Sequence, residues 1–162
     1  MLLWQISPFR DLNGEGGRLF SGRWHFAGTP VVYLAESPAG ALLEIYAHTT
    51  ADDAPPIYTL LKIAGPKLPI TEVAPKDLPV NWTKQPEITR PIGTGWLTSQ
   101  TTSLLRVLSA LVPETANYLL NPLHPGATQF QIERAYEYPL DLRLKPEHVY
   151  QPGSRSIRKT PA

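Results

Sequence analysis

The chain has 162 residues, a formal net charge of +1 and no cysteine. Its length suits one domain with a substantial core, and the lack of cysteine excludes a disulfide scaffold, a thiolate metal site and a cysteine nucleophile. The balanced charge shows no footprint for direct nucleic-acid binding. The N-terminus lacks a secretory pattern, and no apolar run approaches the roughly 20 residues of a membrane span, so we expect a cytoplasmic protein that contacts no membrane.

The first part of the chain predicts two strands, a glycine-rich loop and a helix. A short strand is expected over residues 4–6, followed by a loop over residues 11–22. Residues 29–37 contain a run of β-forming side chains that is apolar on both sides, which predicts a buried strand. Serine is a favoured N-cap and proline is tolerated in the first helical turn, so residues 37–38 start a helix that runs to about residue 48.

The 18 prolines of the chain predict stiff, extended loops and few long helices. Short helices around strands are expected, so the fold class is α+β, in a single domain over residues 1–150. The remaining expected elements are a strand over residues 56–65, loops and single turns over 66–82, a helix within 93–103, a strand or strand pair over 104–112, a compact turn over 116–125 and the last strands within 128–144. Residues 151–162, with Arg155, Arg158 and Lys159, are expected to form a polar, mobile tail.

Two glycine spacings near the N-terminus resemble nucleotide-binding motifs, and both are incomplete. Gly14 and Gly16 open a dinucleotide fingerprint, but Leu19 stands where the third glycine is required. Gly17 and Gly22 have the spacing of a phosphate loop, yet Arg23 and Trp24 stand where that motif requires lysine and a serine or threonine. We therefore interpret the segment as a flexible loop whose glycines take positive φ.

Two charged side chains are candidates for a polar pocket. Arg23 offers a planar fork of donors that suits phosphate or carboxylate, although an arginine lying on Trp24 at the surface fits the sequence equally well. Glu44 points away from the apolar face of its helix, and small residues three and four positions away leave space for a ligand. A solvated helix glutamate is the alternative.

Two polar groups lie on strands that are otherwise apolar. Tyr33 either belongs to the core or faces a cleft, where its ring could stack on a flat ligand. Ser109 must find a hydrogen-bond partner, in the backbone or in a site. The four histidines show no ligand spacing and no nucleophile elbow is present, so neither a metal site nor a serine hydrolase is predicted.

Several separated motifs together resemble the RES-domain family. They are GRW, GTPVVYLAESPAGALLE, GWL, LLRVLSALVP, NYLLNPLHP and DLRL, which occur in this order over nearly the whole chain. The family is named for an arginine, a glutamate and a serine, which fall on Arg23, Glu44 and Ser109. Three positions depart from the family's usual residues: Ser21, His25 and Leu108.

The resemblance implies a toxin of a bacterial toxin–antitoxin pair. Its fold would be similar to that of ADP-ribosyltransferase toxins, with a split β-core and short peripheral helices. NAD⁺ would be the substrate, with no separate cofactor, and would be consumed by hydrolysis or phosphorolysis. ADP-ribose transfer to a host-cell protein is the alternative, and a non-enzymatic binding domain is a further one. The implied partner is a helix-turn-helix antitoxin of the Xre type, and a homodimer of the toxin is compatible with the resemblance.

The resemblance also implies a role for each candidate residue. Glu44 would stabilise the positive charge that develops on the ribose as the nicotinamide–ribose bond breaks, and Ser109 would orient it. Arg23 would hold the pyrophosphate or the ribose. Tyr33 would stack on the nicotinamide or clamp its ribose. The expected substrate-binding set is completed by Trp24 and Asn121.

Overall fold

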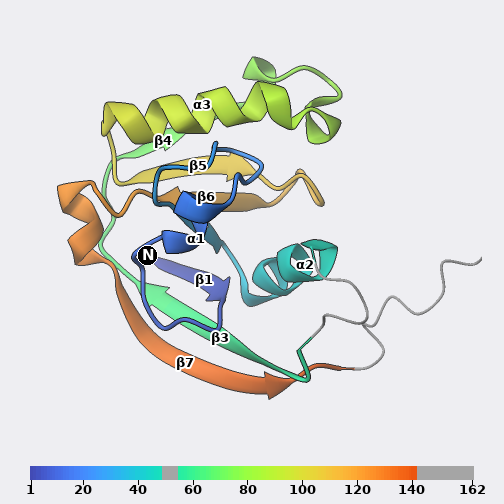
Figure 1. Ribbon diagram of the computed structural model, residues 1–162, viewed down its shortest axis with the longest axis vertical. Helices are drawn as coiled ribbons and strands as arrows, with labels where there is room; N and C mark the ends of the chain where they lie inside the picture. The colour runs from blue at the N-terminus through green and yellow to red at the C-terminus, as the bar shows by residue number, and fades with distance from the viewer. Residues whose placement is uncertain (49–54, 142–162) are drawn as a thin grey trace, which may run out of the picture.

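Strands from the described residues, 1–48 and 55–141, form one mixed sheet of seven strands in this computed structural model (Figure 1). The strand order is β4-β5-β6-β2-β1-β3-β7, and every neighbouring pair is antiparallel except β4 with β5. The strands are β1 (Leu2–Ile6), β2 (Val32–Ala35), β3 (Ile57–Ala64), β4 (Ile70–Glu72), β5 (Leu104–Leu108), β6 (Ala116–Leu120) and β7 (Gln131–Pro139). The helices are α1 (Glu15–Leu19), α2 (Pro38–His48) and α3 (Pro86–Ser99), with short 3-10 helices η1 (Pro75–Asp77), η2 (Trp82–Lys84) and η3 (Pro125–Gln129).

The sheet opens between its two N-terminal strands. β1 and β2 are paired only at Trp4 with Ala35, whereas β1 is paired with β3 along its whole length. The sheet is thus split into a half made of β4, β5, β6 and β2 and a half made of β1, β3 and β7. The α+β class predicted from the sequence is confirmed, and this split creates the space beside which the candidate site lies.

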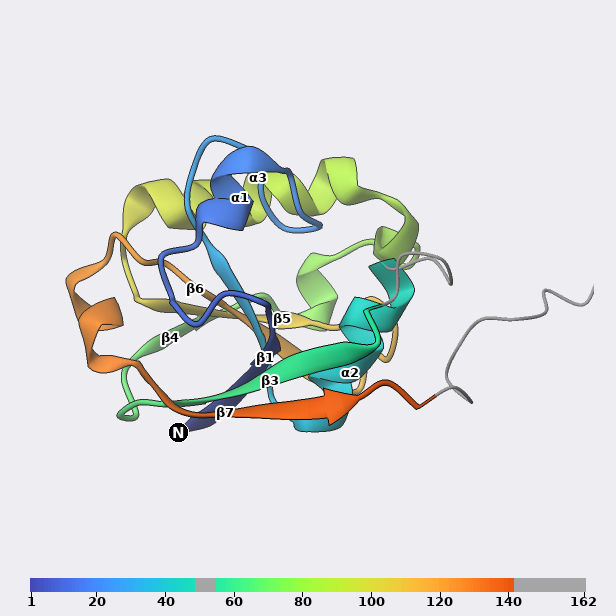
Figure 2. The same cartoon turned by 60° about the horizontal axis from the view of Figure 1, so that its bottom comes forward.

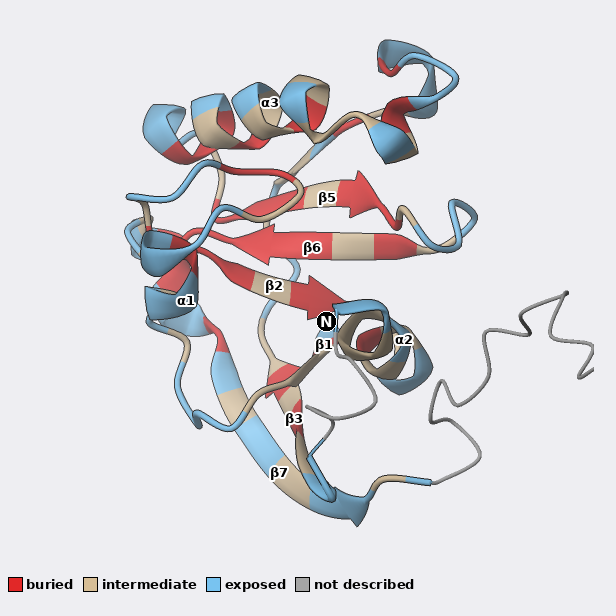
Figure 3. Cartoon of the chain, turned by 45° about the vertical axis from the view of Figure 1, so that its right-hand side comes forward, coloured by how far each residue is buried: buried red, intermediate tan, exposed pale blue. Residues whose placement is uncertain are grey.

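Both faces of the sheet are covered at its central strands β5, β6 and β2, whereas the edge strand β7 is largely exposed. On one face Leu61 and Leu104 are fully buried, and Phe130, which follows η3, packs in the same cluster. On the other face α3 lies along β5 and β6 and packs Trp96 in a cluster with Val107, while α2 covers β1 and the end of β2 (Figure 2). Because both faces are covered, β5 and β6 are buried along almost their whole length (Figure 3).

α2 begins where the sequence predicts it. The hydroxyl of Ser37 accepts a hydrogen bond from the backbone N–H of Gly40 (3.0 Å), and Pro38 is the first helical residue. A serine N-cap satisfies one of the orphan N–H groups of the first turn, and proline loses nothing there. The helix is described as far as His48, and residues 49–54, which follow its predicted end, lie outside the described part of the chain.

α3 begins seven residues before the predicted helix. Pro86 lies in its first turn, where a missing N–H is harmless, and Pro91 lies inside the helix on an exposed position. The second proline removes one intrahelical hydrogen bond, but Trp96 and Leu97 anchor the following turns in the core. Tertiary packing therefore overrides the local signal of the prolines.

Three other expectations were wrong. The glycine-rich loop over residues 11–22 contains α1, and in this loop only Gly14 takes a positive φ (71°). The proline-rich segment contains the edge strand β4, which is too short for a periodic pattern. The turn expected over residues 116–125 contains β6, a central strand, because the Asn-Pro pair that indicated a turn lies just after the strand ends.

The C-terminal expectations are tested only in part. Within the described residues the last strands are a single long one, β7, and residues 142–144 lie outside the described part of the chain. The polar tail over residues 151–162, with Arg155, Arg158 and Lys159, also lies outside it, as does the domain boundary at residue 150. No helix within the described ranges has the length and apolar character needed to span a bilayer.

Candidate active site

A cavity of about 280 Å³ lies beside the split between β1 and β2. Its lining comes from these two strands, from α2, from the loop before β2 and from the β5–β6 hairpin. This volume is near the lower limit of small-molecule sites, roughly 300–1,000 Å³, so the cavity suits one moiety of a larger ligand. The polar residues of the lining are Gln5, Arg23, Tyr33, Glu44, His48 and Asn117.

Glu44 extends from α2 into this cavity, partly buried. Its Oε1 accepts hydrogen bonds from Ser109 Oγ (2.9 Å) and from Asn117 Nδ2 (2.6 Å). Both donors belong to the β5–β6 hairpin, so the hairpin fixes the carboxylate of a helix on the other side of the cavity. Within the described chain both bonds reach Oε1, and none reaches Oε2. One carboxylate oxygen is therefore held in place while the other stays available to a ligand.

The hydroxyl proton of Ser109 is directed at the carboxylate by the backbone. Ser109 follows β5, is buried, and accepts hydrogen bonds from the N–H groups of Leu111 (3.2 Å) and Val112 (3.3 Å). Because a hydroxyl has one proton and two lone pairs, these two donors leave the proton for Glu44. The hydrogen-bond partner that a serine in an apolar strand requires is thus the candidate catalytic glutamate.

Arg23 lines the same cavity as Glu44, on the loop before β2. Its Nη1 donates to the carbonyl of Thr83 (2.8 Å), and its own carbonyl accepts from Thr89 Oγ1 (2.5 Å). Among the described residues no ion pair joins Arg23 to Glu44. A guanidinium has five N–H donors, and the bond to Thr83 uses only one of them. Arg23 therefore lines the same cavity as the carboxylate of Glu44 and keeps N–H donors for a ligand.

Tyr33 lies on β2 and also lines the cavity. Its hydroxyl accepts a hydrogen bond from the backbone N–H of Trp24 (3.1 Å) and lies 2.9 Å from His25 Nδ1. Burial raises the pKa of the Tyr33 hydroxyl above its ordinary value. A Cβ on Gly22 would lie 2.5 Å from this hydroxyl, so only glycine allows the loop to approach the ring.

Two residues of the predicted set lie differently from the others. Trp24 borders the cavity, but it is almost completely buried and its ring packs on Trp82 (5.5 Å between centroids). Asn121 does not line the cavity: it is fully buried, donates to the carbonyl of Leu97 (3.1 Å) and accepts from the N–H of Leu123 (3.1 Å). Those contacts fix the turn after β6, so the geometry gives Asn121 no contact with a ligand in this cavity.

Sequence reasoning missed three polar residues of the cavity. Asn117 was placed in a turn, so the strand alternation that turns it toward Glu44 was not recognised. His48 follows Glu44 by one helical turn, a spacing that places both on one face, and its Nδ1 donates to the Glu44 carbonyl (2.7 Å). Gln5 lies between Trp4 and Ile6, which also line the cavity, and nothing in the sequence around it indicates a site.

The described residues contain no group of three or more histidine, aspartate or glutamate side chains that could hold a metal ion. A carboxylate with two neutral donors, a guanidinium and an aromatic ring can instead bind a polar organic ligand and stabilise a positive charge that develops on it.

Comparisons with known proteins identify the family of the chain. A family model described as the RES domain matches residues 2–141, and the chain belongs to that family. It is similar to "Toxin Res" of Pseudomonas putida, with 47% identity over 82% of this chain and 92% of that protein. It is also similar to "Prs ADP-ribosylating toxin" of Sphingobium sp., with 37% identity over 83% of this chain and 86% of that protein. These relatives place the chain among the RES-domain toxins.

A solved structure shares the fold. A chain of the M. tuberculosis MbcT–MbcA toxin–antitoxin complex superimposes with a TM-score of 0.69 and covers 85% of this chain and 84% of its own length. At 20% identity this likeness concerns the fold alone.

Proposed function

We propose that this RES-domain toxin consumes NAD⁺ by cleaving the bond between nicotinamide and ribose. The observation that carries the proposal is the carboxylate of Glu44, which two hairpin donors hold at the edge of a cavity that also contains Arg23 and Tyr33. The cavity takes the nicotinamide riboside end, and the rest of the dinucleotide lies outside it, since about 280 Å³ suits one moiety.

The chemistry needs few protein groups. Nicotinamide leaves as a neutral base, so no strong general acid is required, and positive charge develops on the ribose as in glycoside cleavage. Glu44 stabilises this charge, with its unbonded Oε2 facing the ribose. Arg23 binds the pyrophosphate or the ribose and fixes the pose of the substrate. Water or phosphate then attacks the ribose carbon.

Chromatography of NAD⁺ and its products, with and without phosphate, tests the proposal on purified protein free of any antitoxin. We expect nicotinamide and ADP-ribose with water as the acceptor, or ADP-ribose phosphate only when phosphate is added. Glu44→Gln should lower the rate by at least about a hundredfold, since the residue stabilises charge in the transition state. Glu36→Gln, an exposed glutamate just before α2, is the matched control and should leave the rate unchanged. Intact NAD⁺ in the wild-type reaction would exclude hydrolysis and phosphorolysis, and would leave transfer to a protein or a non-enzymatic binding domain.

A second candidate function is the transfer of ADP-ribose to a protein. It is favoured by the relative from Sphingobium sp., whose printed name is that of an ADP-ribosylating toxin. Both reactions break the same bond and need the same carboxylate, and they differ only in the acceptor. Labelled NAD⁺ added to a bacterial lysate separates them: a discrete labelled protein band indicates transfer, and free labelled ADP-ribose indicates hydrolysis.

We also propose that an antitoxin of the helix-turn-helix, Xre type binds this chain and blocks the cavity. The proposal is supported by the shared fold with a chain of a toxin–antitoxin complex. Co-expression with a candidate helix-turn-helix antitoxin should yield a complex that consumes no NAD⁺, whereas the toxin released from it by denaturation and refolding should be active.

A further inference from the structure

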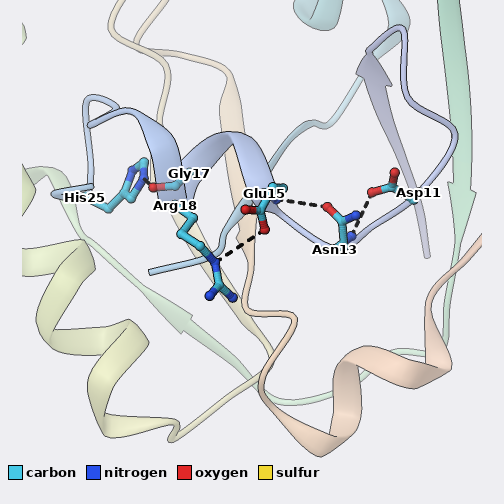
Figure 4. Close-up of polar contacts among 6 residues, drawn as sticks. All are labelled: Asp11, Asn13, Glu15, Gly17, Arg18 and His25. Carbon is cyan, nitrogen blue, oxygen red and sulfur yellow. Dashed lines mark hydrogen bonds and ion pairs between the residues drawn. The ribbon is translucent and has the colours of Figure 1, made fainter. Parts of the chain in front are cut away.

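The imidazole of His25 lies almost completely buried between the glycine-rich loop and β2. Its Nε2 is 2.9 Å from the carbonyl of Gly17, the third residue of α1 (Figure 4). Its Nδ1 is 2.9 Å from the Tyr33 hydroxyl and 3.2 Å from the N–H of Gly22. One ring therefore joins α1, the loop and a strand of the cavity.

These contacts favour one protonation state of the ring. A carbonyl only accepts, so Nε2 must carry a proton. The N–H of Gly22 donates to the backbone carbonyl of His25 (3.1 Å) and also lies 3.2 Å from Nδ1, a contact that suits an unprotonated Nδ1. The Tyr33 hydroxyl already accepts from the N–H of Trp24, and it gives its own proton to Nδ1. The contacts thus favour the neutral Nε2–H tautomer, in which the lone pair of Nδ1 accepts from the Tyr33 hydroxyl.

The surroundings favour the neutral ring as well. Desolvation by burial lowers the pKa of His25, and the nearby Arg90 on α3 lowers it further, against the opposing hydrogen bond to Gly17. Three charged groups act on the pKa of the Tyr33 hydroxyl: Arg90 and Arg23 lower it, and Glu44 raises it. Arg90 also donates from Nε to the carbonyl of Gly22 (2.9 Å), which places its charge beside the loop.

Two glycines of the loop lie close to this ring and leave no room for a side chain. A Cβ on Gly17 would lie 3.0 Å from His25 Nε2 and 2.5 Å from Val31 Cγ1. A Cβ on Gly22 would lie 3.0 Å from His25 Cε1 and closer still to the Tyr33 hydroxyl. Neither glycine has a positive φ, so their role is close approach to the side chains of the cluster.

We propose that His25 is a positioning residue for substrate binding, whose neutral imidazole fixes the Tyr33 hydroxyl and the loop that carries Gly22 and Arg23. The inference rests on the proposed function, because Tyr33 and Arg23 form the part of the cavity that would bind NAD⁺. His25 itself does not line the cavity and acts through these neighbours. Protonation of the ring turns a hydrogen-bond acceptor toward Tyr33 into a donor, so substrate binding weakens in acid.

Steady-state kinetics with NAD⁺ on four variants test the role. His25→Asn keeps an acceptor near the position of Nδ1 but cannot titrate, and we expect its KM to stay within about threefold of wild type. His25→Leu removes the acceptor and should raise KM about tenfold, the equivalent of one hydrogen bond, with kcat little changed. Tyr33→Phe should raise KM by a smaller factor in the His25→Leu background than in the wild-type protein, because the two residues act as one unit.

The pH dependence supplies a readout that a purely structural role would not change. Because burial lowers the pKa of His25 from its ordinary value of 6.5, the wild-type KM should rise only at a pH well below that value, whereas the KM of His25→Asn should stay flat over the same range. Equal KM values for His25→Leu and wild type, or equal pH profiles for His25→Asn and wild type, would overturn the inference.

Nuclear magnetic resonance of the imidazole separates this inference from the proposed function. The signals that vanish in His25→Asn should show the Nε2–H tautomer, and Tyr33→Phe should shift them. If the wild-type protein leaves NAD⁺ intact, the proposed function fails, and these spectra still decide whether the ring fixes Tyr33. An Nδ1–H tautomer, or signals that Tyr33→Phe leaves unchanged, would refute the positioning role.

Discussion

Glu44 is held by residues that lie 65 and 73 positions away in the sequence. Its helix neighbours predict space beside it, because they are small, but no local pattern predicts the two donors on Oε1. Ser109 could be singled out as a polar group on an apolar strand that required a partner. Asn117 could not, since strand alternation is visible only once β6 is recognised as a strand. At the residue scale the sequence therefore predicts candidates, and pairing of distant strands brings them together.

The donors on Glu44 should affect the chemical step more than substrate binding. Asn117→Ala removes one of two hydrogen bonds to a carboxylate, and a bond to a charged group is worth about 1.5–3 kcal/mol, so kcat should fall by about tenfold to a hundredfold. KM should change little, because the lost contact orients Glu44 and does not touch NAD⁺. Glu114→Ala, exposed on the turn of the same hairpin, is the control and should match wild type in both constants. A variant that changes only KM would contradict this role.

The buried His25 should make the stability of the fold depend on pH. Its pKa is lowered in the folded chain, so below about pH 6.5 the unfolded chain takes up a proton that the folded chain refuses. The stabilisation from the neutral ring is complete above that pH and is lost as pH falls, by at most about 1.4 kcal/mol per pH unit. Urea unfolding at several pH values should show a steeper acid loss for wild type than for His25→Asn. Parallel curves would contradict a neutral buried ring.

At the element scale, α3 positions the loop that carries Arg23. Thr89 donates to the carbonyl of Arg23, and the hydroxyl of Thr94 accepts from the N–H of Phe26 (3.0 Å). The helix approaches the loop most closely at Gly93, where a Cβ would lie 1.8 Å from the carbonyl oxygen of Trp24. The sequence predicted a helix in this region but began it seven residues late, so Thr89 and its contact with the loop were not foreseen.

Two glycines of α3 should respond in opposite ways to the same substitution. Gly93→Ala forces a methyl group into the backbone of the loop and should destabilise the protein by about 1–3 kcal/mol. Gly95→Ala is the matched control: a Cβ there meets nothing within 4 Å, so alanine should stabilise the helix by about 0.5–1 kcal/mol. Urea unfolding measures both changes. Equal effects of the two substitutions would contradict the close approach of helix and loop.

At the scale of the whole molecule, the class of fold was predictable and the order of the strands was not. Alternating and apolar runs indicated β2 and β3, and a capping serine with proline indicated α2. β1 lies between β2 and β3 in the sheet, and β6 lies between β5 and β2, which depends on pairing between distant segments. Local composition hid β6, because proline and asparagine follow it directly, and hid β4, because its three residues are too few to show alternation.

The buried clusters on the two faces of the sheet should make the domain unfold as one cooperative unit. Leu61, on β3, is fully buried in the cluster that also contains Leu3 and Leu104 from both halves of the split sheet. Leu61→Ala leaves a cavity there and should lower the free energy of unfolding by about 2–5 kcal/mol.

Ile57→Ala provides the control within the same strand. Its side chain is 58% exposed, so the change should be below about 1 kcal/mol. Far-ultraviolet circular dichroism and tryptophan fluorescence should report the same midpoint for Leu61→Ala, since Trp24, Trp82 and Trp96 lie in the cluster on the opposite face of the sheet. Two separate transitions would mean that the halves of the sheet unfold independently. The cavity is lined by strands of both halves, so it would then be lost in the first transition.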